Sequence, residues 1–287
     1  MIDSVFDFLH NYQPKSEIFS LGFFSLRWYG LFLVLVIFFG LKLSFFWAKQ
    51  YKIWQEKFWS LAFYLIILGI FSARLYHILS EFSYYQNQFW QVFFIWRGGL
   101  GFYGALILGI IFLFFWAKKN KVSFSALADL TAPSLALGEI FIRFGNYFNQ
   151  EIFGRPTDLP WGIPIERQNR LEPYLESEYF HPVFLYQILA SFLIFIVLML
   201  LSRSLAKKIK NGQSFVFGQI FIFYLIFASL VRFFLEFLRI DPQPIIFGLR
   251  LGQTVSLCLL IFGFSILIYL REKKEGKFVN SIEVGTR

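Results

Sequence analysis

Two arginines in this sequence have polar partners at helical spacing, in a pattern that suits the binding of an anion. Arg232 precedes Glu236 by four residues and Arg143 precedes Asn146 by three, so each pair would share one face of a helix. A guanidinium group stays charged and matches two oxygens of a phosphate at once. The two pairs therefore indicate a site for a phosphate group, and the apolar sequence around them indicates where that phosphate belongs.

The composition of the chain requires a membrane around most of it. Of its 287 residues, 57% are hydrophobic, 42 are phenylalanine and only 16% are charged. A typical water-soluble domain has about 25% charged residues, and a surface this apolar would expose large hydrophobic patches to water. The composition excludes a disordered chain, a coiled coil and an ordinary soluble enzyme. It predicts an all-α integral membrane protein, because lipid leaves backbone amides no partner outside a helix.

Seven apolar segments are long enough to cross a bilayer, which takes about 20 residues in a helix. The fourth segment is the least regular, since Asp129, Glu139 and Arg143 interrupt it. We expect one membrane domain over residues 1–287, with spans at 21–47, 58–79, 98–117, 122–147, 181–202, 214–238 and 249–270.

The lysines and arginines between the spans predict the orientation. One alternating set of loops, which includes the tail 271–287, carries 15 of them and the other set carries 6. By the positive-inside rule the richer set is cytoplasmic. The N-terminus would then lie outside, the C-terminus inside, and the loop 148–180 would form a small extracytoplasmic cap. Anionic lipid headgroups account for the net charge of +9, so we expect no nucleic-acid partner.

With this orientation, polar residues from several spans lie at the outer membrane surface. They are Tyr29, Arg74, the segment 98–104, Arg143, His181, Arg232 and Arg239. A charge in hydrocarbon costs at least about 2.5 kcal/mol and usually faces the bundle interior. The phosphate available at that depth belongs to a phospholipid headgroup, so the pattern predicts a phospholipid-handling protein. The alternative is that each arginine is paired or extends to the headgroups.

Cysteine and histidine indicate no metal or redox chemistry. The single cysteine, Cys258, lies in an apolar stretch, which excludes an intrachain disulfide and a cysteine-based metal site. The three histidines are far apart and form no HExxH pair. We expect neither a metal nor a cofactor.

Residues 142–155 carry a specific signature. They read I-R-F-G-N-Y-F-N-Q-E-I-F-G-R, which closely resembles G-R-x-G-N-F-x-N-x-E-x-x-G-R of the bacterial prolipoprotein diacylglyceryl transferase family. The first glycine of the signature is Ile142 here. Shorter strings resemble the family in the same order, and the resemblance spans about residues 20–270. These strings are Trp28-Tyr29-Gly30, Ala73-Arg74-Leu75, Gly98-Gly99-Leu100, His181-Pro182 with Leu185-Tyr186, Arg232 with Glu236–Arg239, and Gly252-Gln253 with Ser256.

The resemblance implies an enzyme of the bacterial cytoplasmic (inner) membrane. Such enzymes transfer the diacylglyceryl group of phosphatidylglycerol to the lipobox cysteine thiol of a prolipoprotein, forming a thioether and releasing glycerol 1-phosphate. The implied partners are phosphatidylglycerol, prolipoprotein signal peptides with a lipobox cysteine, and membrane lipids. Because the substrate supplies the nucleophile, an inert Cys258 is consistent with this reaction.

The resemblance also implies roles for individual residues. Arg143 would be the main headgroup contact, and Arg232 the second phosphate ligand, oriented by Glu236. Tyr29, Asn146 and Glu151 would shape and polarise the site, and Gly154 would permit a tight turn above it. Tyr103 would be a candidate catalytic hydroxyl. Further substrate contacts would come from Arg74, His181 and Arg239.

Several further positions depart from the family pattern. The motif G-G-x-S-x-H-G-G has Gly101, Tyr103 and Ala105 in place of its serine, histidine and second glycine, and H-P-x-Q-L-Y-E closes on Gln187. A tyrosine with a pKa of about 10 is a poor base at neutral pH, so the general base stays unassigned. The departures motivate an alternative, a non-catalytic binder of phospholipid and prolipoprotein. A transporter fits less well, because the arginines gather at one end and no repeat is visible.

Overall fold

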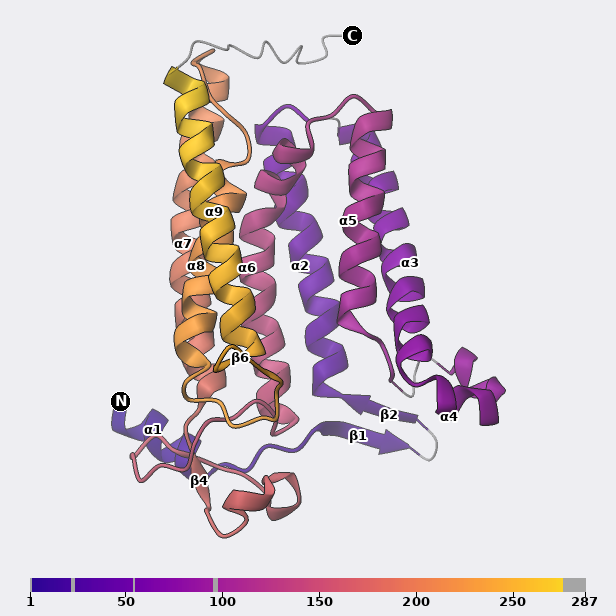
Figure 1. The fold of residues 1–287 in the computed structure, drawn as a ribbon, viewed down its shortest axis with the longest axis vertical. Helices are drawn as coiled ribbons and strands as arrows, with labels where there is room; N and C mark the ends of the chain where they lie inside the picture. The colour runs from indigo at the N-terminus through magenta and orange to yellow at the C-terminus, as the bar shows by residue number, and fades with distance from the viewer. Residues whose placement is uncertain (1, 22–23, 54, 95–97, 276–287) are drawn as a thin grey trace. The chain divides into compact units, whose positions relative to one another are not determined.

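The computed structural model describes residues 2–21, 24–53, 55–94 and 98–275, and these are mostly helical (Figure 1). They form two compact units. The first unit contains the described residues of 1–44 and 128–275, and the second contains those of 45–127.

The long helices of the first unit are apolar along most of their length. They are α2 (Trp28–Gln50) and α6 (Phe124–Phe148), each shared with the second unit, and α7 (Val183–Lys210), α8 (Gln219–Leu235) and α9 (Leu251–Glu275). A short helix, α1 (Ile2–Asn11), precedes them. Helix α8 packs against both α7 and α9.

The second unit is a helical hairpin with a short helical connection. It contains α3 (Gln55–Ser80), α4 (Phe82–Asn87), the 3-10 helix η1 (Phe89–Phe93) and α5 (Phe102–Lys119), and α3 packs along α5. A Cβ added at Gly104 would collide with the backbone carbonyl of Ser72. The absence of a side chain at Gly104 therefore allows the two helices to approach closely.

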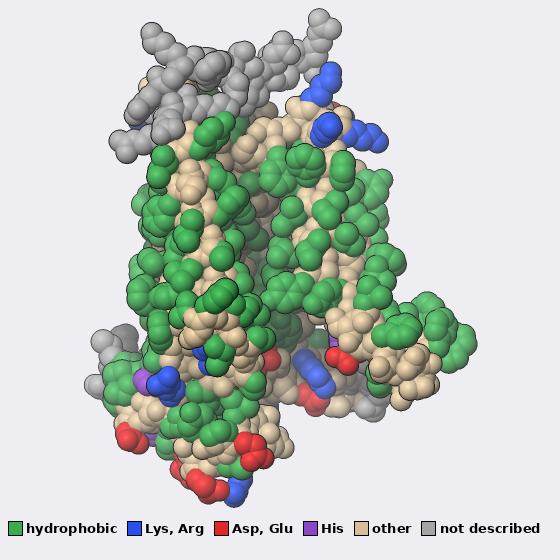
Figure 2. Space-filling view, viewed as in Figure 1, with side chains coloured by type: hydrophobic (Ala, Val, Ile, Leu, Met, Phe, Trp, Pro, Cys, Tyr) green, Lys and Arg blue, Asp and Glu red, His purple; other side chains and the backbone are tan. Residues whose placement is uncertain are grey.

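Six helices in the described residues are long and apolar enough to cross a membrane. They are Trp28–Gln50, Glu56–Ser80, Phe102–Lys119, Phe124–Phe148, Val183–Lys210 and Leu251–Leu270. Figure 2 shows hydrophobic side chains over most of the visible surface of the long helices, with charged side chains toward their ends. A surface of this kind requires lipid rather than water, so the chain is a multi-pass, predominantly helical membrane protein.

The helices begin and end at different residues from those the sequence predicts. The segment expected to begin a span at 21 instead contains a hairpin, β1 (Glu17–Leu21) paired with β2 (Phe24–Arg27), and α2 begins at Trp28. The segment expected to span 214–238 contains α8, which is apolar but has only 17 residues. Of the basic tail 271–287, residues 276–287 lie outside the described residues.

The loop 148–180 folds into a small cap with its own apolar core. It contains β3 (Ile163–Pro164) paired with β4 (Tyr179–Phe180), together with the 3-10 helices η3 (Arg167–Asn169) and η4 (Glu172–Tyr174). The core of the cap joins it to α1, α6 and α7, and its buried members are Leu9, Tyr147, Phe153, Ile163, Ile165, Phe180, Phe184 and Ile188. This packing fixes the chain on both sides of the cap.

A buried aspartate on α6 caps the beginning of α8. Asp129 is fully buried, and its two carboxylate oxygens accept hydrogen bonds from the backbone N–H groups of Gly218 at 2.6 Å and Phe221 at 2.9 Å. These N–H groups belong to the first turn of a helix, where no carbonyl of the same helix can accept them. The cap fixes α8 to α6.

Replacement of Asp129 by alanine should therefore destabilise the protein. The loss of a helix cap costs about 1 to 2 kcal/mol in the free energy of unfolding, and here it also leaves two buried N–H groups unpaired. The thermal midpoint of the detergent-solubilised variant, measured by intrinsic fluorescence, should fall. Asp129→Asn keeps one acceptor, so its thermal midpoint should lie between those of the wild-type protein and Asp129→Ala. An unchanged midpoint for Asp129→Ala would contradict the cap.

Candidate functional site

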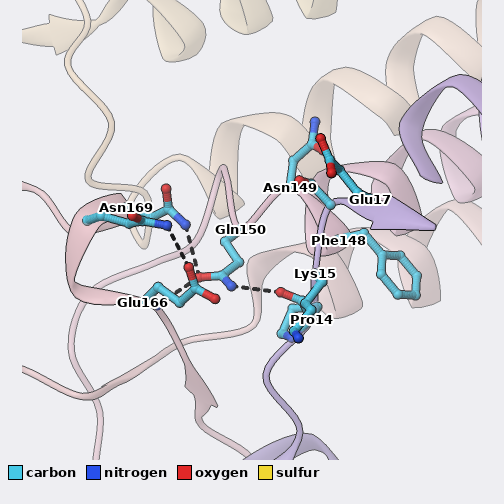
Figure 3. A pocket seen from close by; sticks show the side chains of 10 residues that line it. Pro14, Lys15, Glu17, Phe148, Asn149, Gln150, Glu166 and Asn169 are labelled. Carbon is cyan, nitrogen blue, oxygen red and sulfur yellow. Dashed lines mark hydrogen bonds between the residues drawn. The ribbon is translucent and has the colours of Figure 1, made fainter. Parts of the chain in front are cut away.

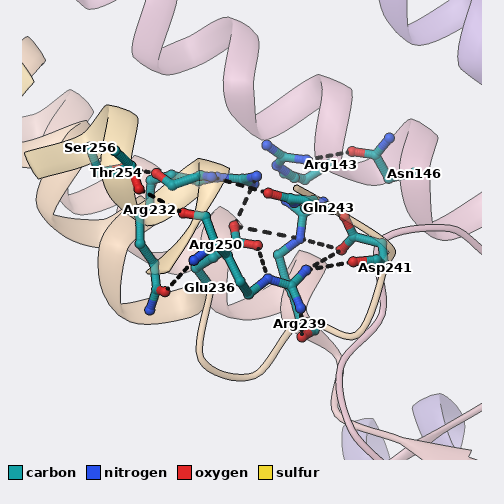
Figure 4. A network of polar contacts seen from close by, with 12 residues as sticks. Arg143, Asn146, Arg232, Glu236, Arg239, Asp241, Gln243, Arg250, Thr254 and Ser256 are labelled. Carbon is teal, nitrogen blue, oxygen red and sulfur yellow. Dashed lines mark hydrogen bonds and ion pairs between the residues drawn. The ribbon is translucent and has the colours of Figure 1, made fainter. Parts of the chain in front are cut away.

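A fully buried carboxylate organises the polar cluster at the end of α8. Glu236 directly follows that helix and has no solvent exposure. One of its oxygens lies 2.9 Å from Arg232 Nη2, and the other accepts a hydrogen bond from Arg250 Nε at 2.8 Å (Figure 4). A third guanidinium, that of Arg239, lies 3.9 Å away. A carboxylate without water is stable only with such compensation. The ion pair predicted from the spacing of Arg232 and Glu236 is present.

The position of Arg250 follows from a hairpin that precedes α9. Strands β5 (Ile245–Ile246) and β6 (Leu249–Arg250) pair around Phe247 and Gly248, both at positive φ. Arg250 then donates from Nη1 to the carbonyl of Arg239 at 2.8 Å and from Nη2 to that of Asp241 at 2.6 Å. Its guanidinium therefore joins α8, the hairpin and α9. From the sequence, Arg250 is only one of the charges between the spans, although its position two residues before the Gly252-Gln253 string is a signal that could have identified it.

Arg239 is held by a second carboxylate. Its Nε and Nη2 donate to the two oxygens of Asp241 at 2.7 and 2.9 Å, and the two side chains thus form a bidentate ion pair. Burial alone would raise the pKa of Asp241, but hydrogen bonds from Arg239 and Gln243 more than offset it and lower that pKa below its ordinary value. The carboxylate is therefore ionised and holds Arg239 firmly.

At the end of α6, Arg143, Asn146 and Glu151 form a chain of hydrogen bonds. Arg143 Nη1 donates to Asn146 Oδ1 at 2.8 Å, and Asn146 Nδ2 donates to Glu151 Oε1 at 2.8 Å. Asn149 Nδ2 donates to the same oxygen at 3.3 Å. The buried Nε of Arg143 has no partner among the described residues. Arg143 is thus fixed on one side and keeps donors for another acceptor.

Arg143 and Arg239 lie close enough to interact electrostatically, although α6 and the segment after α8 are far apart in the sequence. Figure 4 shows Arg143 and Asn146 on α6 facing the cluster formed by Arg232, Glu236 and Arg239. Guanidinium groups repel one another, and an anion between them would remove that repulsion. The structure therefore brings five of the predicted site residues into one region: Arg143, Asn146, Arg232, Glu236 and Arg239.

Tyr29 belongs to the same region because a glycine lets it approach α6. A Cβ added at Gly145 would lie 2.8 Å from Cδ2 of Tyr29, so the ring rests directly on the helix backbone. Its hydroxyl interacts electrostatically with Glu151 and Arg143. The first residues of α2 thus lie on one side of the region that contains Arg143 and Asn146.

Gly154 serves the site through close packing rather than through a turn. A Cβ there would lie 2.7 Å from Cβ of His181 and 3.1 Å from the carbonyl oxygen of Leu238. Its backbone forms an isolated antiparallel bridge with Arg239, and its N–H donates to the carbonyl of His181. The residues of this turn that do have positive φ are Gln150 and Ile152.

The backbone of His181 contacts Gly154, since its carbonyl accepts the hydrogen bond from the Gly154 N–H. Its ring Nδ1 lies 3.2 Å from the hydroxyl of Tyr186, which also accepts a hydrogen bond from Trp161. Burial lowers the pKa of His181, because it disfavours the charged imidazolium. The ring is therefore neutral at pH 7 and adds no positive charge.

Arg74 and Tyr103 belong to the second unit. Arg74 donates to the carbonyls of Val92, Gly98 and Gly99 at 2.8 to 3.0 Å, and also to that of Gln91. These four bonds hold the segment before α5 against α3. Tyr103 lies in the first turn of α5 and is more than half exposed, with its ring 6.2 Å from that of Tyr76. Their proposed contacts with substrate stay predictions.

A separate polar pocket of about 360 Å³ lies beside the cap (Figure 3). Gln150 crosses its floor, donating to the carbonyl of Pro14 at 2.7 Å and accepting from the N–H of Glu166 at 2.7 Å and the amide of Asn169 at 3.1 Å. None of the arginines discussed above lines this pocket. The pocket connects the N-terminal segment to the cap.

The fold and the site together define a multi-pass membrane protein with a buried cluster of arginines and carboxylates suited to an anion. The sequence model of one family, prolipoprotein diacylglyceryl transferase, matches residues 16–269. The chain belongs to this family, as its sequence strings indicated.

Several curated relatives are similar along nearly their whole length, and each is named phosphatidylglycerol–prolipoprotein diacylglyceryl transferase. The protein of Acaryochloris marina is 40% identical over 258 residues, which cover 90% of this chain and 91% of that protein. The protein of Trichormus variabilis is 39% identical, with 91% and 92% covered. The protein of Nostoc sp. is 37% identical, with 91% of each covered.

Replacement of Gly252 by alanine should disturb the buried ion pair. A Cβ at this position would lie 2.6 Å from Oε2 of Glu236 and 3.2 Å from Nη2 of Arg232. Overpacking of this kind costs about 1 to 3 kcal/mol, so the thermal midpoint in detergent should fall. Gly109→Ala on α5 is the matched control, because nothing lies within 4 Å of its added Cβ. Equal midpoints for the two variants would mean that the cluster tolerates the extra methyl group.

Proposed function

We propose that this protein transfers the diacylglyceryl group of phosphatidylglycerol to the lipobox cysteine of a prolipoprotein. Its membership in the transferase family supports this activity. The observation that carries the assignment of the site is the pairing of Arg143 with Asn146 beside Arg239, with a buried N–H of Arg143 left for another acceptor. That acceptor would be the phosphate of the lipid donor.

The reaction exchanges a carbon–oxygen bond for a carbon–sulfur bond. The cysteine sulfur attacks the glyceryl carbon that bears the phosphate, the C–O bond breaks, and its electron pair leaves with glycerol 1-phosphate. The thiol proton passes to water or to the leaving phosphate. Because negative charge grows on that phosphate, fixed positive charge beside it lowers the barrier, and holding both substrates in place supplies further rate.

Arg143 is the main phosphate contact in this proposal, and Arg232 is the second. Glu236 positions Arg232 through the 2.9 Å ion pair, and Asn146 positions Arg143. Tyr29, Glu151 and Gly154 shape the site, and Arg74, His181 and Arg239 are the remaining proposed contacts. The proposal assigns no general base: a thiol with a pKa near 8.5 ionises more readily beside guanidinium groups, so Tyr103 need not act as one.

We further propose a single membrane domain of seven spans in the bacterial cytoplasmic membrane, with the N-terminus and the cap outside. Helix α8, with 17 residues, is a span in addition to the six longer helices, and the distribution of lysine and arginine supports the orientation. The phosphate site is then at the outer membrane surface, and phosphatidylglycerol reaches it laterally from the bilayer.

Arg143→Ala should reduce lipid transfer at least about 100-fold, because it removes a preorganised charge from the transition state. The assay follows transfer from phosphatidylglycerol to a lipobox peptide in detergent micelles. Arg143→Lys should also be impaired, since lysine lacks the planar guanidinium group that donates to two phosphate oxygens at once. Arg167→Ala is the control, because that side chain forms only an exposed ion pair with Glu176. Normal turnover by Arg143→Ala would overturn the assignment.

The same assay separates an enzyme from a lipid binder. A transferase releases glycerol phosphate from phosphatidylglycerol in step with peptide modification, whereas a non-catalytic binder retains the lipid and releases none. We expect stoichiometric release by the wild-type protein. Binding without any release would favour the binder.

The orientation predicts opposite labelling of two introduced cysteines. In a Cys258→Ser background, Glu176→Cys in the cap should react with a membrane-impermeant maleimide on intact spheroplasts. Gln213→Cys between α7 and α8 should react only after permeabilisation, because it lies on the cytoplasmic side. The reverse pattern would overturn the orientation.

A further inference from the structure

Helix α6 carries an acid one helical turn before Arg143 that the proposed reaction has not used. Glu139 Oε1 accepts a hydrogen bond from the Tyr224 hydroxyl at 2.7 Å, and its Oε2 accepts one from the Ser191 hydroxyl at 2.8 Å. The amide of Gln187 donates to Oε2 at 3.4 Å. Side chains of α7 and α8 thus hold both oxygens of an acid on α6.

The surroundings of Glu139 supply hydrogen-bond donors to both of its oxygens. Three donors converge on the carboxyl group, from Gln187, Ser191 and Tyr224. Ser191 is fully buried and Gln187 nearly so. An ionisable group within a membrane span is costly and is usually retained for function. A purely structural link between these helices would not need a charge.

The nearest charged residue to Glu139 along α6 is Arg143. The two residues are four apart on one helix and so share a face. They are close enough to interact electrostatically. Asn146 holds the guanidinium through a hydrogen bond from the other side along the helix. Glu139 therefore attracts Arg143 from a fixed position without occupying the donors that a phosphate would need.

Position 187 adds a sequence observation. The string H-P-x-Q-L-Y-E, which residues 181–187 resemble, ends in glutamate, whereas this chain has Gln187. In the structure, the amide of Gln187 lies 3.4 Å from the carboxylate of Glu139. Glutamate and glutamine have nearly the same shape, so a carboxylate and an amide can exchange places across this contact.

We propose that Glu139 is the positioning residue of Arg143 in this chain and supplies from α6 the negative charge that the family string has at position 187. This proposal rests on the proposed transferase function. It assigns Glu139 no contact with either substrate: it acts on the reaction through the placement of Arg143.

The test exchanges the two residues. Glu139→Gln removes the charge and keeps the shape, and should lower kcat about 10-fold or more, with the KM for phosphatidylglycerol within about threefold, since misplacement affects the transition state most. The double variant Glu139→Gln with Gln187→Glu restores a carboxylate at the same contact and should regain most of kcat. Glu176→Gln, in the exposed ion pair with Arg167, is the charge-matched control and should behave as wild type.

Each result decides the matter. Wild-type kcat in Glu139→Gln, or no recovery in the double variant, would overturn the proposal. So would a rise in KM alone, or a failure of both variants to accumulate in the membrane, since either would assign Glu139 to lipid binding or to folding. If the wild-type protein itself shows no transfer, the proposed function fails instead. Recovery in the double variant with equal thermal midpoints would support positioning over stability.

Discussion

A carboxylate enclosed by helices that lipid surrounds is stable only where positive charge compensates it, and Glu236 obtains this compensation from Arg232 and Arg250. The rest of the site depends on this interaction. Because Arg250 also donates to the carbonyls of Arg239 and Asp241, the same guanidinium fixes the chain between α8 and α9. Removal of the carboxylate would leave neighbouring guanidinium groups repelling one another and would release that connection.

Small residues make this density of charge possible. Gly252 leaves the space that Glu236 and Arg232 occupy, Gly145 lets Tyr29 rest on α6, and Gly154 lets the chain pass between His181 and Leu238. None of the three has a positive φ, so they are required for close approach rather than for backbone freedom. The glycines of the family strings thus have a geometric reason in this chain.

The class of fold and the centre of the site could be predicted from the sequence, because both depend on local patterns. Apolar length identified the helices, and spacings of three and four residues along a helix paired Arg143 with Asn146 and Arg232 with Glu236. The contributions of Arg250 and Asp241 depend on how the chain folds back after α8, which no periodicity encodes. The hairpin Glu17–Arg27 was missed for a related reason: its apolar residues continue into α2, so composition alone gives no boundary.

The arginines differ in how many of their donors the protein itself uses. Arg239 and Arg250 are occupied by carboxylates and carbonyls, and Arg74 by four carbonyls, so these side chains stabilise the fold whether or not a lipid is bound. Among the described residues, the side chain of Arg143 has one hydrogen bond, to Asn146, and its buried Nε has no partner. A preorganised site needs both kinds of arginine: those with occupied donors hold the geometry, and in the proposed reaction Arg143, whose donors are not all used, would bind the phosphate. A reaction accelerated by fixed positive charge depends less on a basic side chain. This is consistent with Tyr103 in the position of the family histidine.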